Sequence, residues 1–181
     1  QEFDRAELGE TPADEPETLE GRTIVTTLGE ITDDFSENNT KVEFQVTEFG
    51  KDSVYTEFQG HELARDYLRS LVRRGTSKIG DVIEVRTTDD YRVQLQPVAF
   101  TAKKADDSQE KSIRRRMNSI VSEKGESLTF EELIDATVSG RLSSSVYNEA
   151  KEIYPVRRVE VQKSKVLATP EEVHEEEEVE A

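Results

Sequence analysis

Three basic clusters, separated along the chain, are the residues best suited to chemistry with another molecule. Arginine and lysine form charge-assisted hydrogen bonds with phosphate, and arginine can do so through two parallel bonds. Clusters from separate segments can form one surface for a polyanion if the fold brings them together. We predict that they bind RNA, through Arg65, Arg69, Arg73, Arg74, Lys78, Lys103, Lys104, Lys111, Arg114, Arg115, Arg116, Arg157, Arg158, Lys163 and Lys165.

The alternative is that the clusters bind no partner, and that each is a solvated face balanced by nearby acids, namely Glu62, Asp66, Glu110 and Glu160. The formal net charge of −16, taken alone, favours it. The charge is segregated, however: residues 1–60 hold 16 acidic and 4 basic side chains, whereas residues 61–165 hold 17 and 20. Residues 166–181 add 7 acidic side chains and no basic ones. Because local charge meets a partner, basic clusters in so acidic a chain favour a phosphate-binding surface.

The spread of the acidic residues indicates a protein that works in molar salt, where surface carboxylates help to keep it soluble. An ordinary protein with an acidic regulatory tail is the alternative. Binding by counterion release would lose roughly five to seven decades between ~0.15 M and ~3 M salt for six phosphate contacts. Bidentate hydrogen bonds and base stacking are not simply screened, and residues 61–165 contain 12 Arg against 8 Lys. Clustered aromatic residues are missing, so we expect recognition of RNA shape and backbone.

Catalysis is poorly supported. The two histidines are His61, expected as a cap or surface residue at a helix start, and His174, in the acidic tail. With no cysteine in the chain, we expect no metal, no cofactor and no catalytic residue. The acid pairs Asp33-Asp34, Asp89-Asp90 and Asp106-Asp107 all fall where turns are expected. We therefore interpret the protein as a binding protein and not an enzyme.

The location is inferred from what the sequence lacks. No apolar run approaches the roughly 20 residues of a membrane helix, and no signal pattern opens the chain. We expect a cytoplasmic protein without a membrane partner. The first residue is Gln1 and not Met, so we expect a preceding segment.

Apolar periodicity predicts an α+β fold, with an antiparallel β-barrel-like core of about six strands and about four packed helices. Strands are expected over about 22–28, 42–47, 54–58, 81–88, 91–101 and 156–162, with a bulge near Pro97. Helices are expected over about 61–74, 108–124 and 143–153. Another helix is expected to begin near Thr129 and Glu132, whose spacing fits a capping box. We divide the chain into an extended acidic lead-in (1–20), a single RNA-binding α+β domain (21–167) and a disordered acidic tail (168–181).

Several blocks resemble a known family. The opening runs from Gly9 to Asp14 and from Gly21 to Ser36, the most distinctive block is His61 to Ile79, and the last is Tyr154 to Val161. They resemble the archaeal and eukaryotic small-subunit ribosomal protein family called, spelled out, "S three a e", over about Glu7 to Leu167. Family members usually begin with a basic, aromatic-rich segment that is absent here before Gln1.

The resemblance implies a structural, non-catalytic protein of the small ribosomal subunit. It implies a β-barrel core seated on the platform near the messenger exit, with rRNA, neighbouring ribosomal proteins and possibly mRNA as partners. By the same resemblance, Arg65, Arg69, Arg73, Arg74, Arg157 and Arg158 would touch rRNA. The halophilic character implies an archaeal source. The alternative is a free cytoplasmic module whose acidic surface binds a basic protein.

Overall fold

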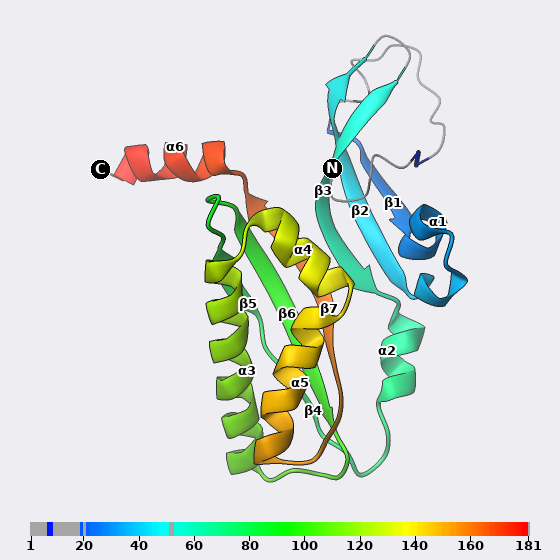
Figure 1. Ribbon diagram of the computed structural model, residues 1–181, viewed down its shortest axis with the longest axis vertical. Coiled ribbons are helices and arrows are strands. Elements are labelled where there is room, and N and C mark those ends of the chain that lie inside the picture. The colour runs from blue at the N-terminus through cyan, green and yellow to red at the C-terminus, as the bar shows by residue number, and fades with distance from the viewer. Residues whose placement is uncertain (1–6, 9–18, 20, 51–52, 181) are drawn as a thin grey trace. The chain divides into compact units, whose positions relative to one another are not determined.

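The computed structural model describes residues 7–8, 19, 21–50 and 53–180. The chain divides into two compact units, Gln1–Ala64 and Arg65–Ala181, and each is described by itself. Figure 1 shows the helices and strands of both. Among the described residues, no helix is both long and apolar enough to cross a membrane.

The first unit is built on a three-stranded antiparallel meander. β1 (Thr23–Thr27) pairs with β2 (Thr40–Phe49), which pairs with β3 (Val54–Leu63). The helix α1 (Leu28–Thr32) and the 3-10 turn η2 (Phe35–Glu37) connect β1 to β2. Alternation along β2 buries Val42, Phe44 and Val46, and Phe44 meets Phe58 edge to face at 6.2 Å. The period-2 pattern read from the sequence is therefore the pattern of the folded strand.

The sheet of the second unit is centred on β6 (Arg92–Thr101). β7 (Val156–Ala168) pairs with one side of β6, and β4 (Lys78–Gly80) and β5 (Ile83–Arg86) pair with the other. β4 ends at the pair Gly80↔Val98 and β5 begins at Ile83↔Leu95, which leaves Pro97 opposite the break. The β6–β7 register shifts between Gln96 and Pro97, so the predicted irregularity is confirmed. A residue without an N–H is tolerated there.

Three helices lie over this sheet, as Figure 1 shows: α3 (Asp107–Ser127), α4 (Phe130–Val138) and α5 (Arg141–Ile153). The buried side of α3 carries Ile113, Met117 and Val121. The predicted capping box at α4 is confirmed, because the Thr129 side chain accepts from the Glu132 N–H and the Thr129 N–H donates to Glu132. Each helix buries one apolar stripe and leaves its polar side to solvent.

The prediction of a helix beginning at His61 is wrong. β3 continues to Leu63, with His61 opposite Val42 and Leu63 opposite Thr40. The helix α2 spans only Arg65–Leu71. The helical apolar spacing from His61 onward was outweighed by backbone pairing with β2, which buries His61 and Leu63. His61 is thus a buried strand residue and not the expected cap or surface residue.

The α+β class with antiparallel strands is confirmed. The described residues form seven strands and six α-helices, where about six and about four were expected, and in neither unit do they close into a barrel. In the acidic tail, α6 spans Pro170–Glu180. Thr169 caps this helix through Glu172, and Val173 is buried. The expected domain boundaries 1–20, 21–167 and 168–181 stay a prediction.

Gly125 lets α3 approach β5 closely, and we predict that Gly125→Ala destabilises the protein. A Cβ there would lie 2.6 Å from Val85 Cβ, too close for two carbon atoms that are not bonded to each other. Overpacking of this kind costs about 1–3 kcal/mol, more than the ~1 kcal/mol that Ala gains over Gly in a helix. Urea unfolding in molar potassium chloride measures the loss. Glu126→Ala, at an exposed neighbouring position, is the control and should leave stability within about 0.5 kcal/mol.

Asp81 makes the stability of the fold depend on pH. Asn118 Nδ2 donates to Asp81 Oδ2 at 2.7 Å and the Val82 N–H donates to Oδ1 at 2.9 Å. These bonds, that of Asn118 first, lower the pKa of Asp81 from its usual value. A carboxyl whose pKa is depressed by folding adds stability above its unfolded-state pKa and loses that contribution as the pH falls through its folded-state pKa.

We therefore predict that Asn118→Ala destabilises the protein by roughly 1–2 kcal/mol at about pH 7. The difference between the variant and the wild type should shrink as the pH falls through the lowered pKa of Asp81, where this carboxyl protonates in the folded protein. Urea unfolding at several pH values checks this. A difference that is independent of pH would show that the Asp81 bond is not its source.

Candidate nucleic-acid interface

All fifteen predicted RNA-binding residues lie in the second unit, whose sheet brings several of them to one end. β6 pairs with β4 and β7 on opposite sides, and Phe100 lies opposite both Lys78 and Arg158. Neighbouring strands are about 4.8 Å apart, so the backbones at Lys78 and Arg158 are roughly 10 Å apart. Lys78 and Arg158, 80 positions apart in the sequence, therefore lie at the same position along the strands of the sheet.

Buried hydrogen bonds join the two loops at the same end. The Ser77 N–H donates to Thr101 Oγ1 at 2.8 Å, and the Thr101 N–H donates to the Ser77 carbonyl at 3.0 Å. The Ala105 N–H donates to Ser77 Oγ at 3.1 Å. These bonds attach the turn before β4 to the loop before α3. We call the exposed cations of these joined segments, and of the first turns of α3 that follow, the basic end: Arg73, Arg74, Lys78, Lys103, Lys104 and Lys111.

The start of β7 also belongs to this end of the unit. The Ala102 N–H donates to the Pro155 carbonyl at 2.9 Å, and the Tyr154 hydroxyl donates to the Lys104 carbonyl at 3.0 Å. Three segments distant in the sequence therefore meet through main-chain and side-chain bonds. The loops are short and joined to one another by hydrogen bonds, so the backbone that carries the cations is held in place.

Arg65 and Arg69 lie on α2, one turn apart, and are exposed. α2 itself is held by β7. The Tyr67 hydroxyl donates to Glu160 Oε1 at 3.0 Å, and the Arg157 guanidinium donates to the Leu71 carbonyl. Arg73 and Arg74, expected on this helix, follow its end and lie in the turn before β4, where Gly75 has φ +72°.

Several other predicted cations are engaged within the protein. Arg116 Nε donates to Glu149 at 3.0 Å, and this hydrogen bond raises the pKa of Arg116. Arg158 Nε donates to Glu160 at 2.6 Å, and Arg114 Nε donates to the Gly80 carbonyl at 3.3 Å. Glu160, one of the four acids expected to balance the basic clusters, pairs with Arg158. Glu149, which pairs with Arg116, was not among those four.

The remaining candidates lie elsewhere on the unit. Lys163 and Lys165 are opposite Gln96 and Gln94, five and seven residues along β7 from Arg158. At about 3.3 Å per residue they lie roughly 17–23 Å from it. Arg115 is exposed on α3. In the described parts of the chain, no ion pair is recorded for Arg65, Arg69 or any member of the basic end.

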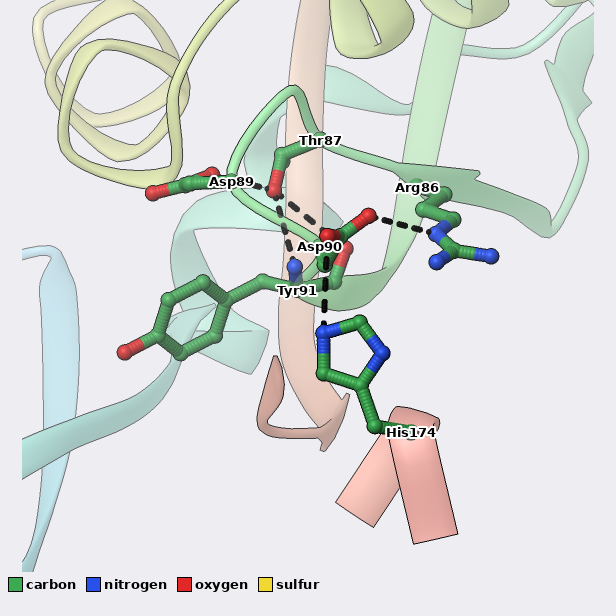
Figure 2. A network of polar contacts seen from close by, with 6 residues as sticks. All are labelled: Arg86, Thr87, Asp89, Asp90, Tyr91 and His174. Atoms are coloured by element: carbon green, nitrogen blue, oxygen red, sulfur yellow. Dashed lines mark hydrogen bonds and ion pairs between the residues drawn. The ribbon is translucent and has the colours of Figure 1, made fainter. Parts of the chain in front are cut away.

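No competing site emerges from the acidic turns. Figure 2 shows the turn at Asp89 and Asp90, where Asp89 accepts from the Thr87 hydroxyl at 2.6 Å. Asp89 also accepts from the Phe130 N–H at 2.9 Å. Asp90, with φ +65°, pairs with Arg86 at 2.9 Å and lies 3.7 Å from His174. The expectation that Asp89 and Asp90 bend the chain is confirmed. Within the described residues, no group of three acidic, His or Cys side chains could hold a metal ion.

The residues that the sequence analysis missed are those that position the cations: Ser77, Thr101, Tyr67 and Glu149. Ser and Thr give no periodic signal, and the bonds that join the two loops link residues 24 or more positions apart. Only the capping and turn residues, whose partners are local, could be found from spacing.

The chain matches the family model described as the Ribosomal S3Ae family over residues 1–170. It is 64% identical over 178 residues to the small ribosomal subunit protein eS1 of Haloarcula marismortui, covering 98% of this chain and 84% of that protein. It is 62% identical to the eS1 protein of Natronomonas pharaonis, over 97% and 85%. The eS1 protein of Archaeoglobus fulgidus is 46% identical, over 93% and 81%. The resemblance inferred from the sequence is confirmed, and the chain belongs to the Ribosomal S3Ae family.

Proposed function

We propose that this protein is a structural constituent of the small ribosomal subunit, and that it binds folded rRNA through the basic end and the arginines of α2. The observation that carries the proposal is the convergence of cations from three segments at one end of the second unit. Membership of a ribosomal family supplies the setting. The role is non-catalytic, in the cytoplasmic ribosome.

The cations are suited to a ribosome in concentrated salt. Four of the eight cations of α2 and the basic end are arginines, whose planar group can form two bonds with one phosphate. Their side chains are exposed, so RNA need not displace an ion pair to reach them. Arg116 and Arg158, by contrast, would have to give up a carboxylate partner.

The acidic parts of the chain have a different role in the proposal. The acidic excess lies in residues 1–60 and 166–181, outside the segment that carries the basic end. Neighbouring ribosomal proteins cover part of that acidic surface. The protein sits at the platform, near the messenger exit, where it supports subunit assembly, and contact with mRNA belongs to the same proposal.

Charge reversal at the basic end tests the proposal. We predict that Arg73→Glu reduces incorporation of a tagged copy into small subunits at least about tenfold, because it replaces a phosphate contact with repulsion. Sedimentation of lysate in molar potassium chloride measures it. The control is Lys124→Glu, with the same charge change at an exposed position near the other end of α3.

Incorporation of Arg73→Glu at the wild-type level would contradict the proposal. A wild-type copy that stays at the top of the gradient would instead favour the free acidic module. In that case, binding should depend on the acidic residues of α6.

The preference for arginine has its own test. We predict that the double substitution of Arg73 and Arg74 by Lys weakens rRNA binding modestly at low salt and by about tenfold or more in molar salt. The charge is unchanged, but the bidentate hydrogen bonds are lost. Filter binding across a salt series measures both limits. An equal effect at all salt concentrations would show that bidentate bonding is not the reason for arginine.

A further inference from the structure

We propose that Glu160, Tyr67 and Arg157 are positioning residues, which hold α2 on β7 so that Arg65 and Arg69 face the same RNA as the basic end. This inference rests on the proposed function. It gives Arg157 a role inside the protein, whereas the family resemblance would place it in contact with rRNA.

α2 needs contacts from other parts of the unit to keep its position. α2 has seven residues and none of them is fully buried. Isolated helices shorter than about 12 residues are marginal in water, and helices in proteins depend on packing of an apolar face. The apolar side chains that α2 packs, those of Tyr67, Leu68 and Leu71, are only half-buried. Polar contacts from β7 must therefore contribute to its position.

The first contact is made at Glu160. One carboxylate oxygen, Oε1, accepts from the Tyr67 hydroxyl at 3.0 Å and from Arg158 Nε at 2.6 Å. The Glu160 side chain is only 16% exposed, so these charge-assisted bonds are partly protected from solvent and salt. Arg158 holds the carboxylate in place and Glu160 holds the helix.

The second contact is made at the other end of α2. The Arg157 guanidinium donates to the carbonyl of Leu71, the last residue of the helix. A cation there satisfies a carbonyl left without a helical partner and matches the negative end of the helix dipole. Val156 and Arg158 pair with Thr101 and Phe100, so Arg157 is the extra residue of a β-bulge. Bulges re-aim side chains, and this one brings Arg157 to α2.

The two contacts run in opposite directions along the two elements, because Tyr67 precedes Leu71 on α2 whereas its partner Glu160 follows Arg157 on β7. Tyr67 and Leu71 are one turn apart on α2, and Glu160 and Arg157 are three residues apart on β7. α2 is therefore attached along its length to the strand that begins at the basic end. Arg65 and Arg69 are oriented by that attachment, since they share the helix with Tyr67.

The test uses the sign of an effect. Removing a carboxylate near a phosphate-binding surface should by itself strengthen binding of RNA. If Glu160 positions α2, Glu160→Gln should instead weaken binding, by about threefold to tenfold, through the loss of a charge-assisted bond. Tyr67→Phe should have the same effect with no change of charge. The double variant should be no worse than the stronger single one, because both remove the same contact.

The experiment measures binding of the full chain to rRNA extracted from small subunits of the source cells, in molar potassium chloride. Hydrogen exchange of the α2 amides is measured in parallel and should accelerate in both variants. The control is Asp135→Asn, which also removes the carboxylate of an ion pair, with Arg141, but on α4. It should leave both quantities unchanged.

A spectroscopic readout identifies the contact. Desolvation, followed by the charge of Glu160, raises the pKa of Tyr67. The alkaline absorbance difference between the wild type and Tyr67→Phe isolates the Tyr67 titration. We expect Glu160→Gln to shift it to lower pH, whereas Asp135→Asn should not.

Unchanged or tighter binding by Glu160→Gln would overturn the inference, even if α2 exchanges faster, because positioning would then have no consequence for RNA. A wild-type chain that binds no rRNA would overturn the proposed function. In that case the exchange rates would still decide whether Glu160 and Tyr67 hold α2.

Discussion

The register of β6 between its two neighbours is the constraint on which the rest of the second unit depends. Because Phe100 lies opposite both Lys78 and Arg158, the turn before β4 and the start of β7 must share one end of the sheet. The Ser77 and Thr101 bonds then fix the loop before α3 at that end. A slip of one residue would exchange the two faces of the strand and separate these loops. The surface of the basic end is thus a consequence of backbone pairing.

The arginines divide between two tasks. Arg114, Arg116, Arg157 and Arg158 are engaged with carbonyls or carboxylates of the protein, whereas Arg65, Arg69, Arg73 and Arg74 extend to solvent. Exposed pairs such as Arg116 and Glu149 contribute little to stability, because water and salt screen them. Stability rests on the apolar layer between α3, α5 and the sheet, where Gly125 permits close contact with Val85. Hydrogen bonds that involve charged side chains orient segments with little apolar contact, and α2 is an example.

Local sequence was sufficient for features whose cause is local. The alternation in β2, the capping box of Thr129 and Glu132, the Asp turn at Asp89 and the irregularity at Pro97 were all predicted, because each depends on residues a few positions apart. β4 was not predicted, since its three residues contain a single apolar side chain. The helix was placed too early at His61 because the spacing of Leu63, Tyr67 and Leu71 fits a helix, while the β2 partner that keeps His61 and Leu63 in a strand is distant.

The family, the α+β class and the segregation of charge could all be predicted from the chain, since they depend on residue type and order alone. The cations could be named in the same way, but which of them share one end of the sheet depends on how the strands pair in the folded protein. Lys78 and Arg158 lie level because both pair with Phe100 of β6, and Arg157 reaches α2 because a bulge in β7 redirects it. Such contacts join residues 24 to 93 positions apart. Their geometry depends on strand register, which no local spacing in the chain encodes.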